Sequence, residues 1–351
     1  MIELPANRPE RDGTADLLKG FAVLFMIQVH LMEQFVSPDV FQSLIGKTSL
    51  FLGGPMCAPV FLAVMGYFAA SSSRPTSYFL RRGLLLFVGG ILLNIARSAN
   101  LLVQIILGKV SLDPLFFILG ADILTLAGLS LVMTGFLRVF FRKKWWLYAL
   151  IAVFVASISP TLNLFESQNR EAGYAIGFLF GIAQWSYFPL FPWFSYVLAG
   201  YSFCLLVQRF PTLKAIDLRN HFIYFIPLWI GIIITIPYAS GITHKLNGAG
   251  GYYHHGILFF GWVILFSLSY LALMKLVDIY YGNNRFTMMV KWIGQKVTTL
   301  YVIQWMIIGN IASLLYRSQN LFQFAAWFVI VTLLTIFMGQ VFYKIKAMSA
   351  R

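Results

Sequence analysis

A lysine and a histidine lie in the first apolar stretch of the chain, at a spacing that places them on one face of a helix. Lys19 and His30 are eleven residues apart, so at 100° per residue their directions agree to within about 20°. Glu33 falls about 40° to the other side of that face. Ionisable groups within a membrane span are costly and tend to face a cavity or a partner. The spacing therefore predicts a polar track, with His30 as a candidate general base or nucleophile, although a packing histidine and a lysine anchored at the membrane surface remain the alternative.

Asp122 is a second ionisable residue within an apolar segment. The segment 113–137 predicts a span that runs opposite to the first, and Asp122 would lie about 14 Å from its start. At that depth the carboxylate could approach His30 and orient its imidazole, as Glu33 could. His30, Asp122 and Glu33 are therefore the candidate catalytic residues. A hydrogen bond that bridges two helices would explain Asp122 equally well.

The composition indicates which solvent surrounds these residues. Of 351 residues, 59% are hydrophobic, 17% aromatic and only 11% charged, and the mean hydropathy is +0.78. Soluble domains carry about 25% charged residues, so the chain is predicted to be an all-α integral membrane protein. The net charge of +14 comes from residues between the apolar stretches, and we expect no nucleic-acid partner. We also expect no metal site, because the adjacent pair His254-His255 lacks helical ligand spacing and has no cysteine nearby.

Ten stretches are long and apolar enough to span a membrane. They are 15–36, 48–72, 78–97, 113–137, 145–163, 185–208, 221–240, 255–277, 288–312 and 321–343. Nineteen of the 26 Lys and Arg residues fall on the side of the N-terminus, six fall on the other side, and Lys296 falls within a span. Short cytoplasmic loops accumulate basic residues, which predicts a single domain over 1–351 with both termini cytoplasmic and a short cytoplasmic segment at 1–14.

Further polar residues would lie around the track. Asn94, Arg97 and His254 fall on the predicted outer side, where they could form the mouth for an acceptor, although histidines in loops are most often simply solvated. In the ninth stretch, Lys296 and Asn310 share a face and Gln304 lies nearby, so all three could offer hydrogen-bond donors to a cavity. Lys296 lies near the cytoplasmic end, where a lysine can also extend to the membrane surface.

Five segments of the chain carry motifs whose order is informative. The first is Arg11-Asp12-Gly-Thr-Ala-Asp16-Leu-Leu-Lys19-Gly20, after which His30 follows with ten residues between it and Lys19. The later ones, in order, are Pro59-Val-Phe61 to Gly66, Asp122 to Gly128, Phe188-Pro189-Leu-Phe-Pro192-Trp193, and Gly294 to Tyr301. These segments resemble the transmembrane acyltransferase superfamily, which includes acyltransferase family 3 and the heparan-alpha-glucosaminide N-acetyltransferase-like proteins. Gln304 departs from the pattern of acyltransferase family 3, which often has a second histidine at this place.

The resemblance implies an acyl-CoA-dependent enzyme that passes an acyl group, most simply acetyl, to a hydroxyl or amine of a glycan or similar small-molecule acceptor. The polyanionic nucleotide of acyl-CoA would bind the basic residues at the cytoplasmic face, Lys19, Arg81 and Arg82, together with Lys296 or, as an alternative, Lys291. The pantetheine arm would follow the first helix to His30, which would act as a base or carry the acyl group transiently. Asn94, Arg97, Gln304 and His254 would then contact the acceptor.

Two other functions remain open. A transporter or permease for an anionic metabolite would also suit ten spans with buried Lys, His and Asp residues, although the sequence shows no internal repeat and no broken helices in matching positions. A scaffold within a glycan-assembly complex would need none of these side chains. The short loops, the lack of an appended lumenal domain and the resemblance favour a bacterial inner membrane, and a homo-oligomer is possible.

Overall fold

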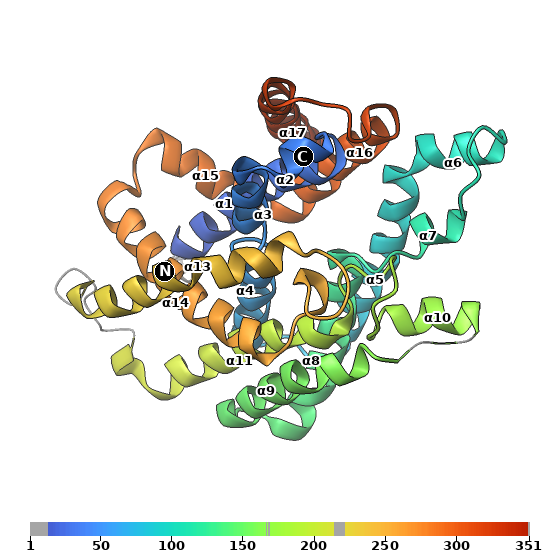
Figure 1. Ribbon diagram of the computed structural model, residues 1–351. Coiled ribbons are helices and arrows are strands. Elements are labelled where there is room, and N and C mark those ends of the chain that lie inside the picture. The colour runs from blue at the N-terminus through green and yellow to red at the C-terminus, as the bar shows by residue number, and fades with distance from the viewer. Residues whose placement is uncertain (1–12, 166, 168, 214–221, 350–351) are drawn as a thin grey trace.

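The computed structural model describes residues 13–165, 167, 169–213 and 222–349. Within these residues the protein is a bundle of helices with two isolated β-bridges (Figure 1). Ten helical segments in this part of the chain are long and apolar enough to cross a membrane. The predicted class, an all-α polytopic membrane protein, is confirmed. Most of the predicted N-terminal segment, 1–12, and the start of the seventh stretch at 221 lie outside the described residues.

The ten spans follow one another along the chain with short helices between them. The spans are α1 (Gly13–Gln34), α3 with α4 (Leu44–Gly53 and Ala58–Ser71), α5 (Thr76–Arg97), α8 (Ile123–Phe141), α9 (Trp145–Leu162), α11 (Leu190–Arg209), α13 (Ile226–His244), α14 (Ile257–Tyr281), α16 (Val297–Leu315) and α17 (Leu321–Ser349). The shorter helices are α2 (Pro38–Gln42), α6 (Ala99–Ile106), α7 (Pro114–Ile118), α10 (Arg170–Gly177), α15 (Arg285–Gln295) and the 3-10 turns η1 (Pro211–Leu213), η2 (Phe222–Phe225) and η3 (Tyr252–His254).

The interior of the bundle is built around α11. Trp193 and Tyr196 of α11 are fully buried, and this helix packs against α4 and α9. The contact with α4 is a close approach of two backbones, because a Cβ at Gly66 would lie 1.9 Å from the Val197 carbonyl oxygen and one at Gly200 would lie 1.9 Å from that of Ala63. Small residues permit such approaches between membrane helices. By contrast, α17 buries only 11% of its apolar window and presents the rest outward.

The second and ninth spans, which the sequence pattern predicts as continuous, are broken in the structure. The second span is interrupted between Gly53 and Ala58, and the ninth is divided at Lys296 into α15 and α16. The expectation of unbroken helices was therefore wrong at these places, because hydropathy reports only that a stretch is apolar. Irregular backbone at membrane depth is tolerated where protein or a cavity surrounds it. Gly53, Gly54 and Cys57 of the first break indeed line a cavity.

The fourth span begins later than predicted. Residues 113–137 were expected to form one helix, but Pro114–Ile118 is a separate short helix, α7, and α8 begins only at Ile123. The intervening backbone pairs with a second irregular segment, since the Ala121 amide donates to the Trp185 carbonyl and the Phe188 amide to the Ala121 carbonyl, both at 2.8 Å. Asp122 is therefore the N-cap of α8 instead of a residue within the helix.

Candidate active site

A cavity of about 530 Å³ lies where α1, α5 and α16 end and where α8 begins. Its walls combine Met26, His30 and Glu33 of α1 with aromatic residues from later segments, Tyr187, Phe188, Tyr252, Tyr253, Tyr301 and Trp305. This volume is typical of small-molecule sites, as is a mostly apolar lining with a few polar groups. The cavity therefore collects titratable residues that are far apart in the sequence.

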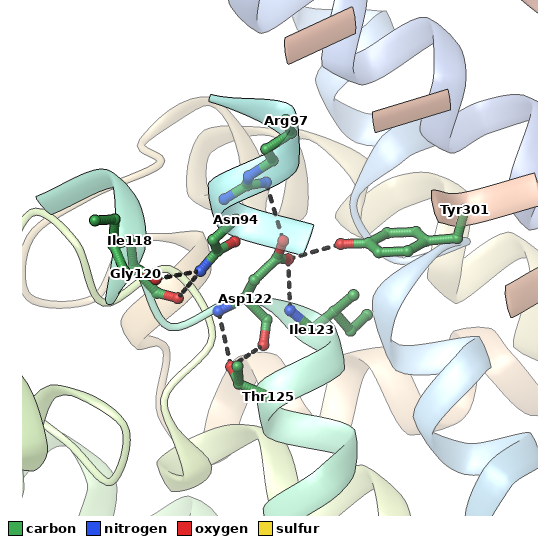
Figure 2. Close-up of polar contacts among 8 residues, drawn as sticks. All are labelled: Asn94, Arg97, Ile118, Gly120, Asp122, Ile123, Thr125 and Tyr301. Carbon is green, nitrogen blue, oxygen red and sulfur yellow. Dashed lines mark hydrogen bonds and ion pairs between the residues drawn. The ribbon is translucent and has the colours of Figure 1, made fainter. Parts of the chain in front are cut away.

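The centre of its polar wall is an ion pair between Arg97 and Asp122. The Arg97 Nη1 lies 2.9 Å from the Asp122 Oδ2, and only 13% and 6% of the two side chains are exposed. The Tyr301 hydroxyl donates to the Asp122 Oδ1 at 2.8 Å, as Figure 2 shows. A cation from α5 and a hydroxyl donor from α16 thus converge on one carboxylate at the start of α8, which offsets the cost of burying its charge.

Local hydrogen bonds explain why Asp122 is fixed there. Its Oδ1 accepts from the Ile123 amide at 2.6 Å, and its own amide donates to the Thr125 hydroxyl at 3.0 Å. The Asp122 side chain also accepts from the Thr125 amide, so Asp122 and Thr125 form a capping box, in which side chains satisfy amides that the first turn of a helix leaves free. Asn94 holds the preceding turn, because its Nδ2 donates to the carbonyls of Ile118 and Gly120 (Figure 2).

His30 lines the same cavity but makes a different contact. Its ring packs against the Trp305 indole at 4.0 Å between centroids, and the Arg97 Cζ lies 4.4 Å from the centroid of that indole. The buried His30 Nδ1 has no hydrogen-bond partner among the described residues, so Asp122 does not orient it by direct contact. Trp305 therefore contacts both the imidazole and the guanidinium.

Glu33 lies one helical turn beyond His30, also on the cavity wall. Its carboxyl interacts with the Tyr253 hydroxyl from the segment that joins α13 to α14. The Arg97 charge is already paired with Asp122, so Glu33 is the acidic group of the cavity that has no ion pair among the described residues. It can accept hydrogen bonds from the hydroxyls or amine of a ligand.

Three residues proposed for the acceptor site lie behind the cavity wall. Asn94 and Gln304 are fully buried, and His254 is 1% exposed; none of the three lines the cavity. Asn94 supports the Asp122 turn, whereas neither amide atom of Gln304 has a partner in the described part of the chain. Of the four acceptor candidates, only Arg97 lies on the cavity itself.

His254 and His255, expected to be solvated, are buried in the segment between α13 and α14. Asn163 donates to the His254 carbonyl at 3.1 Å, and the Tyr196 hydroxyl lies 2.8 Å from the His255 Nε2. Burial lowers the pKa of each imidazole to about 4, so both stay neutral in the folded protein at neutral pH. Sequence periodicity gives no signal for such burial of a loop.

This burial predicts how stability depends on pH. In the unfolded chain each histidine has a pKa of about 6.5, and in the folded protein the pKa is about 4. Between pH 6.5 and pH 4 the unfolded state therefore binds more protons than the folded state, so stability falls as the pH falls. Each imidazole contributes at most about 1.4 kcal/mol per pH unit in this window. We expect the thermal unfolding midpoint in detergent to drop from pH 7 to 5, with a smaller drop in His254→Phe. Equal slopes in the two proteins would contradict this assignment.

The basic residues proposed for the nucleotide lie away from the cavity. The cavity reaches along α1 only as far as Met26, whereas Lys19 lies nearly two turns earlier and pairs with Asp16 at 2.8 Å. Arg81 and Arg82 are exposed in the first half of α5. The Lys296 ammonium lies 4.1 Å from the centroid of the Tyr343 ring. The structure thus brings the predicted catalytic residues together and keeps this basic set separate from them.

A comparison with protein families supports the resemblance seen in the motifs. The family model described as heparan-alpha-glucosaminide N-acetyltransferase, catalytic, matches residues 11–233, which is more than half of the chain. The chain belongs to this family. Family membership implies acetyltransferase activity in a multi-pass membrane protein and favours an enzyme over a transporter. No curated protein matches the chain.

Part of the site of this acetyltransferase family member lies beyond the matched residues. Tyr301 and Trp305 belong to α16, after residue 233, yet they contact Asp122, Arg97 and His30 of the matched part. The sequence motif Gly294 to Tyr301 includes Tyr301 without indicating a role for it, and no motif points to Trp305 or Tyr253. Helical spacing offered a signal, because Tyr301, Trp305 and Gly309 recur every four residues on one face of α16 and all line the cavity.

Proposed function

We propose that the protein is a membrane-embedded acetyltransferase that moves the acetyl group of acetyl-CoA to a hydroxyl or amine of a glycan or similar small acceptor. The observation that carries this proposal is that His30 lines the same cavity as the Arg97–Asp122 pair. A base beside a fixed cation is the arrangement that acyl transfer needs. A bacterial inner membrane is the proposed location.

In the proposed reaction His30 removes a proton from the acceptor as its oxygen or nitrogen attacks the thioester carbonyl. The negative charge that develops on the carbonyl oxygen requires hydrogen-bond donors. Arg97 carries five N–H donors and lines the cavity, so those not bound to Asp122 can supply them. The carbon–sulfur bond then breaks, and the CoA thiolate receives from the imidazolium the proton that His30 took from the acceptor. Asp122, which accepts hydrogen bonds from the Ile123 amide and the Tyr301 hydroxyl, keeps Arg97 in place through their ion pair.

The two-step version, in which His30 carries the acetyl group, uses the same cavity. It predicts that labelled acetyl-CoA without acceptor leaves label on the protein, which is released when acceptor is added. Direct transfer predicts no labelled protein. Glu33, beside Tyr253, is proposed to bind the polar groups of the acceptor in either case.

The test of the proposed function is transfer by the purified protein in detergent or liposomes. Acetyl-CoA with a labelled acetyl group is supplied with a panel of amino sugars and neutral sugars, and both free CoA thiol and labelled product are measured. The proposal expects thiol release that depends on acceptor and equals product formed. Release that is independent of every acceptor, or uptake of a solute without CoA, would contradict it.

The nucleotide of acetyl-CoA is proposed to bind at the opposite end of α1 from the cavity. Lys19 is about 16 Å along the helix axis from His30, a separation that an extended pantetheine arm can cover. The residues between Lys19 and Met26 would have to admit the arm, because the cavity ends at Met26. Arg81, Arg82 and Lys296 are further candidates for contacts with phosphate groups.

Replacing Lys19 by alanine is expected to weaken acetyl-CoA binding. A ligand at 100 times its dissociation constant stabilises the native state by about 2.7 kcal/mol, which a thermal-shift titration detects. We expect the titration of Lys19→Ala to need at least about 10-fold more ligand for the same shift. Arg209→Ala is the matched control, since Arg209 is exposed at the same end of the bundle and lies outside the proposed site. Identical titrations of wild type and Lys19→Ala would remove Lys19 from the nucleotide site.

A further inference from the structure

The helix that carries Arg97 is interrupted immediately after this residue. α5 ends at Arg97, Ser98 separates the two helices, and α6 begins at Ala99. If the helix continued regularly, the Asn100 amide would donate to the Ala96 carbonyl four residues earlier. This hydrogen bond is replaced in the structure.

A side chain from α16 occupies the position of the missing hydrogen bond. The Asn310 Nδ2 donates to the Ala96 carbonyl oxygen at 2.9 Å, and its Oδ1 accepts from the Asn100 amide at 3.0 Å. One side-chain amide therefore satisfies both backbone groups of the missing hydrogen bond, the Ala96 carbonyl and the Asn100 amide. The Asn100 side chain donates in turn to the Asn310 carbonyl at 3.3 Å. Insertion of a side chain into the hydrogen-bond ladder is an established cause of a helix bend.

Gly309 permits this insertion. A Cβ at Gly309 would lie 2.5 Å from the Arg97 carbonyl oxygen and 2.9 Å from the Arg97 Cβ, so no other residue fits without moving one of the helices. One turn earlier on the same helix, Trp305 packs against the Arg97 guanidinium. α16 thus holds both the backbone and the charged end of Arg97.

We propose that Asn310 is a positioning residue for Arg97. By bridging the break between α5 and α6, it fixes the bend from which Arg97 reaches Asp122 and the cavity. Asn310 does not line the cavity itself, so it acts on the reaction only through Arg97. The catalytic part of this inference rests on the proposed function, whereas the coupling between Asn310 and Arg97 does not.

The kinetic test compares Asn310→Ala in two backgrounds. A displacement of about 1 Å at a catalytic group can lower the rate about 100-fold, so we expect Asn310→Ala to lower kcat at least about 10-fold, with the KM for acetyl-CoA changed less than about 2-fold. In Arg97→Met, where there is no guanidinium to position, adding Asn310→Ala should change kcat less than about 2-fold. If Asn310→Ala lowered kcat by the same factor in Arg97→Met as in the wild type, the proposal would be overturned.

Two further variants distinguish a specific effect on the position of Arg97 from a general disturbance of α16. Thr299→Val removes another hydrogen bond between helices from the same helix, to the Tyr343 hydroxyl at 2.8 Å and away from the cavity; it should retain wild-type kcat. Gly309→Ala forces α16 away from Arg97 and should reproduce the kcat loss if Asn310→Ala fails to fold. A loss of kcat in Thr299→Val as large as in Asn310→Ala would overturn the proposal.

A measurement without substrate keeps the inference testable if the wild-type protein transfers no acetyl group. Hydrogen exchange should be faster at the Asn100 amide in Asn310→Ala, and the shifts in unfolding midpoint caused by Asn310→Ala and Arg97→Met should not add. An inactive wild type would then reject the proposed function, whereas unchanged exchange together with additive shifts would reject the role of Asn310.

Discussion

Replacing His30 by alanine is expected to lower acetyl transfer about 100- to 10,000-fold, the range that a general base contributes. The imidazole packs on Trp305 and lines the cavity, so the variant removes the group that is proposed to take the acceptor proton. The measurement is the initial rate of acceptor-dependent CoA release with saturating acetyl-CoA. His30→Asn, which restores a polar atom near the position of Nδ1 but not a base, should be equally slow.

Binding of the donor serves as the control for His30. If the nucleotide binds at the far end of α1, as proposed, the acetyl-CoA-induced thermal shift of His30→Ala should equal that of the wild type. A slow variant with normal donor binding assigns the loss to the chemical step. A His30→Ala protein that keeps most of its transfer rate would contradict the mechanism, whatever its stability.

The sequence predicted the class of fold because lipid imposes a simple rule on composition. Each span needs about 20 apolar residues, and the structure has a helix at each of the ten predicted stretches. The breaks at Gly54–Cys57 and at Lys296 could not be predicted, since a broken helix around a cavity has the same hydropathy as a continuous one. The side of the membrane on which each terminus lies stays a prediction from the distribution of basic residues.

The candidate site was predicted in part, and the misses have a common cause. His30, Glu33 and Asp122 all line the cavity. They could be predicted because an ionisable residue in an apolar stretch is informative by its type alone. Gln304 was chosen as a polar residue of the ninth stretch and His254 as a histidine on the predicted outer side, yet their neighbours Trp305 and Tyr253 line the cavity. Consecutive residues of a helix differ by 100° in direction, so a prediction needs the facing helices and not only the residue type. The bond from Tyr301 to Asp122 connects residues 179 positions apart, and no local pattern contains it.

Breaking the Arg97–Asp122 pair is expected to affect both stability and activity, and a double variant should separate the two effects. Arg97→Met leaves the Asp122 charge buried with the Tyr301 hydroxyl and the Ile123 amide as donors, and loss of one partner of a buried pair typically costs about 3–5 kcal/mol. The measurement is the free energy of unfolding in detergent, together with the transfer rate.

Adding Asp122→Asn to Arg97→Met removes the remaining charge while keeping an oxygen that can cap α8 and accept from Tyr301. We therefore expect the double variant to recover at least half of the lost stability but to remain about 100-fold slower than wild type, because the donors proposed for the oxyanion are absent. Recovery of stability without recovery of rate would assign to Arg97 a role in the reaction beyond folding. If the rate instead rose in parallel with stability, the pair would be structural, and the charge that stabilises the transition state would have to come from another residue of the cavity.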